Sequence, residues 1–171
     1  SFLFLAIVSF LALSASFYLN HTEIKPAEGG EYVEGIVGSP RFINPVYAAS
    51  DADRDLTELI YSGLMKFDGN GKIVPDLVKE YKILDDGKTY EFYLKENLFW
   101  HDLKPLTADD VVFTIKTIQD ASLKSPLQPT WWGVKVDKIS DLGVRFELKN
   151  SSAVFLENCT LKIMPKHIWQ D

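Results

Sequence analysis

The chain has 171 residues, and its 24 acidic and 18 basic residues give it a formal net charge of −6. The basic residues are scattered along the chain, which argues against a nucleic-acid surface, because phosphate binding needs a clustered positive footprint. A single cysteine, Cys159, excludes a disulfide framework and a cysteine-rich metal site.

An almost continuous apolar run extends from Phe2 to Leu19 and is interrupted only by small and hydroxyl residues. A helix that is apolar on all sides is typical of a membrane or a large core, and the run is shorter than the roughly 20 residues of a membrane span but long for a signal-peptide core. We expect residues 1–19 to form an N-terminal anchor or signal segment, with a retained transmembrane helix favoured over cleavage. A tether follows over residues 20–31, and either arrangement predicts that the rest of the chain is exported.

An extended segment and a helix are expected next. The apolar residues of Tyr32–Gly38 predict a strand, and two prolines, Pro40 and Pro45, hold the following loop extended. Three aspartates then lie at the positive end of a helix dipole. They are Asp51, Asp53 and Asp55, and the apolar face of the helix comprises Leu56, Leu59, Ile60 and Leu64. An EF-hand calcium loop would also need a glycine at its sixth position and a glutamate at its twelfth, so we interpret the aspartates as capping residues.

Strands are predicted from Lys66 to Trp100. Residues that tolerate positive φ occur in Asp68–Gly71 and again in Asp85–Gly87, so each segment predicts a hairpin turn. Between these turns and the next helix, Tyr90, Phe92 and Leu94 alternate with more polar residues. This alternation predicts a strand with one buried face and one wetter face.

A helix with a well-defined start is predicted from Thr107 to Gln119. Thr107 is a favourable N-cap, and the carboxylate of Asp110, three residues later, can accept a hydrogen bond from the backbone N–H of the cap. Four apolar residues at helical spacing predict one buried stripe. They are Val111, Val112, Ile115 and Ile118.

Two adjacent tryptophans, Trp131 and Trp132, follow a loop that contains two prolines. Neighbouring side chains on an extended strand point to opposite faces, so at least one ring is expected to face a groove or an interface. The alternative is that both rings cover the core. The remaining expected elements are strands over Val134–Ile139, Val144–Lys149 and Leu161–Met164, and a helix that begins at Pro165.

No catalytic or metal-binding motif accompanies these elements. The sequence has no nucleophile elbow and no phosphate-binding loop, and its histidines, His21, His101 and His167, lack the spacing of paired metal ligands. The carboxylates lie in predicted turns and caps, which gives paired acid–base catalysis no support. We therefore expect a binding protein that uses neither a metal nor a cofactor.

The segment "PLTADDVVFTI", residues 105–115, carries a family resemblance. Preceded by an aromatic-Trp-x-Asp stretch, it resembles the family 5 extracellular solute-binding proteins, which are the peptide, dipeptide and nickel receptors of bacterial ABC importers. Four further blocks agree in order and, with the first, cover most of Tyr32–Trp169: "FINPVYAASDADRDLTELIYSGLMKFD", "GKIVPDLVKEYKILDDGKTYEFYLKENLFW", "VRFELKN" and "IMPKHIW". The family pattern usually has Gly where this chain has Leu103, so the resemblance does not predict how tight this turn is.

The resemblance implies an α/β fold of the periplasmic-binding-protein-like class, type II, of the oligopeptide-receptor kind. Such receptors are much longer than this chain, so an N-terminal part is expected. Residues 32–50 would supply the first-lobe strand and loop, residues 51–150 the extra α/β subdomain, and residues 151–171 the return to the first lobe. The second lobe, with much of the ligand cleft, would lie outside this chain.

The function implied by the resemblance is that of a substrate-binding receptor, not an enzyme. It would capture peptides at the outer face of the cytoplasmic membrane, to which its N-terminal segment anchors it, and deliver them as a monomer to the transmembrane subunits of an ABC permease. The alternative is an exported α/β hydrolase whose catalytic residues lie beyond Asp171. A third hypothesis is a structural surface protein with the same fold.

The resemblance also indicates ligand-binding residues. In the family, the segment after the first Asn/Asp-Pro pair reaches the cleft, and here that pair is Asn44-Pro45. The loop after the signature helix contributes an aromatic residue in some relatives. The candidates are therefore Ala49, Ser50 and Asp51, together with Trp131 or Trp132. For Asp51, a structural role at the helix start is the competing hypothesis.

Overall fold

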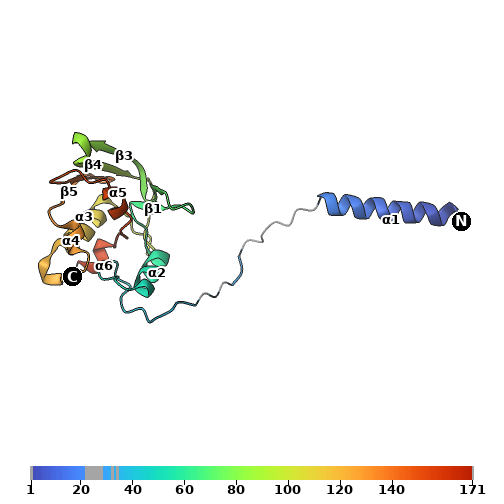
Figure 1. The fold of residues 1–171 in the computed structure, drawn as a ribbon, viewed down its shortest axis with the longest axis horizontal. Coiled ribbons are helices and arrows are strands. Elements are labelled where there is room, and N and C mark those ends of the chain that lie inside the picture. The colour runs from blue at the N-terminus through green and yellow to red at the C-terminus, as the bar shows by residue number, and fades with distance from the viewer. Residues whose placement is uncertain (1, 22–28, 32, 34, 171) are drawn as a thin grey trace. The chain divides into compact units, whose positions relative to one another are not determined.

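The computed structural model describes residues 2–21, 29–31, 33 and 35–170, and it divides into two units, Ser1–Gly35 and Ile36–Asp171. Figure 1 shows the ribbon of both. Residues 22–28 of the expected tether lie outside the described residues.

Among its described residues, the first unit contains the helix α1 over Phe2–His21. Large apolar side chains along this helix are exposed, among them Phe2, Phe4 and Phe10. Within the part of the chain that the structure describes, no helix combines the length and apolarity needed to cross a membrane. The transmembrane helix expected in residues 1–19 is therefore not found.

The second unit contains a four-stranded antiparallel sheet, which lies at the upper side of this unit in Figure 1. Its strands are β3 (Val78–Leu84), β4 (Thr89–Leu94), β5 (Lys135–Ser140) and β6 (Gly143–Glu147), in the order β3-β4-β6-β5. The turn η1 (Asp85–Gly87) joins β3 to β4. A second, two-stranded sheet pairs β1 (Met65–Phe67) with β2 (Ile73–Pro75). Both hairpins predicted from their turn residues are thus confirmed.

One face of the four-stranded sheet carries the core. Tyr90, Phe92 and Leu94 of β4 are at most 4% exposed, which confirms the predicted buried face. On the other face Tyr93 is partly exposed but Glu91 is only 8% exposed, so the predicted alternation in burial is incomplete. Helix α3 (Ala108–Gln119) packs against β5 and β6. The ring of Phe146 lies at the centre of an aromatic cluster. The ring centroids of Phe92, Trp131 and Phe155 lie 5.7, 5.9 and 5.6 Å from it.

The buried stripe predicted for the helix at Thr107–Gln119, observed as α3, is confirmed in three of its four residues. Val111, Ile115 and Ile118 are at most 1% exposed, whereas Val112 is only partly buried. A stripe on one side of a helix buries its central residues most completely. Val112 lies at the margin of this stripe.

The opposite sheet face is polar. The Arg145 guanidinium donates two hydrogen bonds, of 3.0 and 2.7 Å, to one carboxylate oxygen of Glu91, and the Tyr93 hydroxyl donates to the other at 2.9 Å. The bonds from Arg145 and then from Tyr93 hold the pKa of Glu91 below its usual value. Both edge strands of the sheet, β3 and β5, also contain charged residues. They are Lys79, Glu80 and Lys82 on β3, and Lys135, Asp137 and Lys138 on β5.

The start of α3 fixes a distant part of the chain. Thr107 is the N-cap, and its backbone N–H donates to the carboxylate of Asp110 at 2.9 Å, as predicted. The other oxygen of this carboxylate accepts the backbone N–H of Lys166 at 2.8 Å. One turn further on, the hydroxyl of Thr114 accepts the backbone N–H of Met164 at 3.0 Å. Buried polar side chains of α3 thereby hold the segment that leads into α6 (Lys166–Trp169).

The turn before α3 is tight although it has Leu103 where the family that the sequence resembles usually has glycine. The Trp100 N–H donates to the Lys104 carbonyl at 2.8 Å, and the Leu103 N–H donates to the Trp100 carbonyl at 2.9 Å. Leu103 has a φ of 66° and an 80% exposed side chain. The left-handed conformation costs an L-residue roughly 1–2 kcal/mol, and little packing offsets that cost here.

Leu103→Gly is therefore expected to raise the free energy of unfolding by about 1 kcal/mol, because glycine adopts the left-handed conformation without strain. Urea denaturation of the two proteins measures the difference. His101→Gly is the control, since His101 lies in the same turn without a positive φ, and it should be neutral or destabilising. A loss of stability in Leu103→Gly would contradict the strain argument.

Two expected strands are not found among the described residues. In Tyr32–Gly38, the described residues 33 and 35–38 form no strand, and no described segment pairs with them. Strands need a partner for their backbone hydrogen bonds. Leu161–Met164 is instead held by an isolated antiparallel bridge between Gly63 and Lys162. A Cβ on Gly63 would lie 2.6 Å from the Thr160 carbonyl oxygen, so this close approach requires glycine.

Candidate ligand-binding site

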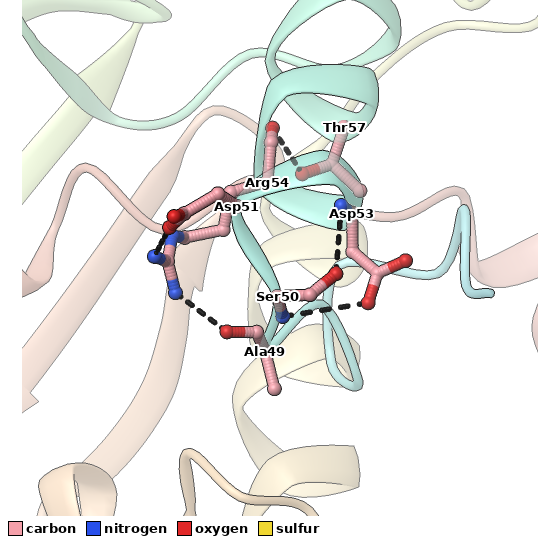
Figure 2. A network of polar contacts seen from close by, with 6 residues as sticks. All are labelled: Ala49, Ser50, Asp51, Asp53, Arg54 and Thr57. Atoms are coloured by element: carbon pink, nitrogen blue, oxygen red, sulfur yellow. Dashed lines mark hydrogen bonds and ion pairs between the residues drawn. The ribbon is translucent and has the colours of Figure 1, made fainter. Parts of the chain in front are cut away.

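The loop that precedes α2 (Asp51–Ile60) is held by one buried carboxylate. Ser50 is the N-cap of α2, and its hydroxyl accepts the Asp53 N–H at 3.1 Å. In return, the Asp53 carboxylate accepts the Ser50 N–H at 3.4 Å, which closes a capping box (Figure 2). The same carboxylate accepts the N–H groups of Arg41 and Phe42 at 2.6 and 3.0 Å.

This arrangement determines the ionisation of Asp53, which is 3% exposed. The backbone N–H of Phe42, the side chain of Ser50 and the backbone N–H groups of Arg41 and Ser50 lower the pKa of Asp53 from 3.8 to about 2. Hydrogen bonds to the charged form favour that form. Asp53 therefore acts as a structural anion, in agreement with the interpretation of this aspartate as a capping residue.

The predicted residues Ala49, Ser50 and Asp51 lie together at the exposed start of α2. Arg54 reaches back over this segment, donating to the Ala49 carbonyl at 2.6 Å and pairing with the Asp51 carboxylate (Figure 2). Asp51 is not the N-cap, because Ser50 holds that position, and its side chain is 86% exposed. The apolar face predicted for this helix was wrong at Leu59, which is 78% exposed.

The two tryptophans have different environments. Trp131, the last residue of α4 (Gln128–Trp131), is 2% exposed and packs against Phe146 and Phe155. Trp132 is 72% exposed and lies at a shallow hollow beside Gln119 and Lys135. One ring therefore belongs to the core and the other faces outward, although the extended strand assumed in the prediction is not found, because Trp131 ends a helix.

A pocket of about 350 Å³ lies next to the segment predicted to bind ligand. Its walls come from the loop before α2, from α2 itself, from α4 with the residue before it, from α5 (Phe155–Asn158) and from the segment that follows α5. Trp131 is the only one of the five predicted residues among the described residues that line it. The lining residues are Pro45, Ala48, Arg54, Thr57, Glu58, Leu127, Thr130, Trp131, Glu157, Asn158, Thr160, Leu161 and Lys162.

Sequence reasoning missed the polar wall of this pocket. Arg54, Thr57 and Glu58 stand at helical i, i+3 and i+4 spacing, which places them on one face of α2. That spacing was a usable signal. Lys162, which completes the wall, has no local signal, because its partner Glu58 is distant in the sequence.

The family model for the bacterial extracellular solute-binding proteins of family 5 (Middle) matches residues 72–168. The oligopeptide-binding protein AppA of Bacillus subtilis is 37% identical over 147 residues, which are 84% of this chain and 27% of that protein. The dipeptide-binding protein of Escherichia coli is 30% identical over 146 residues, which cover 72% of this chain and 27% of that protein. The chain thus spans about a quarter of the length of these relatives.

Solved structures of solute-binding proteins also resemble this chain. The structure of AppA from Bacillus subtilis in complex with a nonapeptide matches with a TM-score of 0.81 and 36% identity, over 86% of this chain and 30% of that chain. NikZ from Campylobacter jejuni, in complex with Ni(L-His), matches with a TM-score of 0.73 and 30% identity, over 78% of this chain and 27% of that chain. The α/β architecture is therefore that of the type II periplasmic-binding-protein-like receptors. Because the family model covers more than half of its residues, the chain belongs to family 5 of the bacterial extracellular solute-binding proteins.

Proposed function

We propose that this chain is part of a receptor that captures peptides outside the cytoplasmic membrane and delivers them to the permease of an ABC importer. The observation that carries the proposal is the match over 86% of the chain to a structure that holds a nonapeptide. The name of the B. subtilis relative, an oligopeptide-binding protein, agrees with it. The family is one of solute-binding receptors and not of enzymes, so the hydrolase alternative has no support.

Within this function, we place the peptide main chain over the start of α2. Ala49 and Ser50 have small, exposed side chains, which allow an extended ligand to approach the protein backbone closely. The exposed ring of Trp132 offers a flat surface that accepts many side chains, which suits a receptor with broad specificity. Asp51 lies at the same end of the helix, beside Arg54, and Trp131 lines the adjacent pocket.

Calorimetry with a peptide ligand on the full-length receptor tests this placement. Ser50→Trp should weaken binding at least tenfold, about 1.4 kcal/mol, because the bulky ring occupies the ligand's path. Ser50→Ala is the control that distinguishes the steric effect of the tryptophan ring from the loss of the helix cap. It should lower the free energy of unfolding by about 1 kcal/mol, because the N-cap is lost, and leave the affinity for peptide near that of the parent. Equal affinities of Ser50→Trp, Trp132→Ala and the parent would refute the placement.

We further propose that α1 associates with the membrane, as an anchor or as a signal segment during export. Its exposed apolar side chains support this, because such a surface is unfavourable in water. Fractionation of cells that express the full-length protein tests the proposal. An anchored receptor sediments with membranes, whereas a mature protein recovered in solution with its N-terminus near Phe17 indicates cleavage.

A further inference from the structure

The pocket beside α2 contains a buried cation with an unusual partner. The side chain of Lys162 is 10% exposed, and its Nζ lies 2.6 Å from Oε1 of Glu58. A lysine ammonium has three N–H donors, and Glu58 is the one ion-pair partner that the described residues give it. A buried charge is costly unless it is paired, so the Lys162 ammonium needs a carboxylate beside it.

Glu58 is a replaceable partner. Its side chain is 66% exposed, so it can turn into water without leaving a buried charge of its own. With Glu58 turned out, the charged residues that line the pocket are Arg54, Lys162 and Glu157, which leaves an excess of one positive charge. Arg54 remains held at the pocket's edge by the Ala49 carbonyl and Asp51.

The floor of the pocket is fixed before any ligand arrives. Trp131 is buried, and the Gln119 side chain donates to the carbonyls of Trp131 and Val134 at 2.8 and 2.6 Å. The hydroxyl of Ser125 donates to the Val46 carbonyl at 2.7 Å and ties the loop before α4 to the loop before α2. A preformed apolar floor with a few convergent polar and charged groups is the usual construction of a small-ligand site, and 350 Å³ is within the usual range.

From this geometry we infer that the pocket is a subsite for a carboxylate of the ligand, which replaces Glu58 on the Lys162 ammonium. The inference rests on the proposed peptide-receptor function and adds a preference to it. A peptide can supply this carboxylate from an acidic side chain or from its C-terminus. Trp131 and Leu127 then contact the carbon chain that carries the carboxylate.

The test is calorimetry on the full-length receptor with alanine tetrapeptides. One set has amidated C-termini and carries glutamate or the isosteric glutamine at each position in turn, and a second pair compares the free C-terminal acid with its amide. In the parent, one carboxylate form should bind about tenfold more tightly than its neutral counterpart, which is typical of a charge-assisted hydrogen bond. The set in which the difference occurs identifies the source of the carboxylate.

Two substitutions should change this preference in opposite directions. Lys162→Met keeps the buried stem and removes the charge, so it should abolish the preference, while Glu58→Gln removes the competing carboxylate and should increase it severalfold. Lys66→Met is the matched control, because Lys66 pairs with Asp76 and does not line the pocket. Neutral peptides should bind Lys66→Met and the parent alike.

The other possible results of these titrations either support the carboxylate subsite or overturn it. Equal binding of acidic and neutral peptides to the parent overturns the subsite and leaves the peptide-receptor function standing. If no tetrapeptide binds, the receptor function fails and glutarate alone tests the pocket by NMR titration. Glutarate that binds the parent but not Lys162→Met supports the subsite, and glutarate that binds neither or both overturns it.

Discussion

Trp131→Ala should lower the free energy of unfolding by about 3–5 kcal/mol, the usual range for truncating a large buried aromatic side chain. The Trp131 ring contacts Phe146 and Phe155 and is 2% exposed, so its removal leaves a cavity in the aromatic cluster. Trp132→Ala, at a 72% exposed ring, should change the free energy of unfolding by no more than about 0.5 kcal/mol.

Urea denaturation followed by circular dichroism measures both variants without relying on tryptophan fluorescence. The pair matters for the binding site, because loss of peptide binding in Trp131→Ala would reflect damage to the core as much as a missing contact. Of the two tryptophans, Trp132 is therefore the one to substitute in peptide-binding experiments. Similar stabilities for the two variants would show that Trp131 does not support the core.

Asp110→Ala should lower the free energy of unfolding by about 3 kcal/mol. The substitution removes the acceptor for the backbone N–H groups of Thr107 and Lys166, and a buried donor left without a partner costs roughly 1–3 kcal/mol. Asp109→Ala is the matched control, since Asp109 pairs with Lys138 at a partly exposed position. Such pairs contribute about 0–1 kcal/mol.

Urea denaturation gives the two free energies, and amide hydrogen exchange shows where protection is lost. Exchange at Lys166 should accelerate in Asp110→Ala and stay at the parent's rate in Asp109→Ala. Unchanged exchange at Lys166 would contradict the role of Asp110 in holding the C-terminal segment.

Elements with local signals were predictable from the sequence. The turn residues of Asp68–Gly71 and Asp85–Gly87 determine their hairpins, and Thr107 with Asp110 starts a helix through neighbours three residues apart. These signals depend on chain neighbours alone. The strand expected at Tyr32–Gly38 was wrong for the described residues 33 and 35–38, because apolar composition does not supply a pairing partner.

The candidate site was less predictable, because its contacts join residues far apart in the chain. The capping box of Ser50 and Asp53 has a local pattern, but the hydrogen bonds that the Arg41 and Phe42 N–H groups donate to Asp53 span 12 and 11 residues. Only tertiary packing decides that Trp131 is buried and Trp132 exposed. The roles of the five predicted residues in ligand binding stay predictions.

The charged edges of the four-stranded sheet have a consequence for self-association. An edge strand leaves backbone donors and acceptors open, and a second molecule can extend the sheet across them. On β3 and β5, such an approach would bring Lys82 or Lys138 and their charged neighbours against those of the other copy. The charged groups along these edges are of both signs and would lose water on such an approach, so the cost of their desolvation opposes edge-to-edge growth of the sheet.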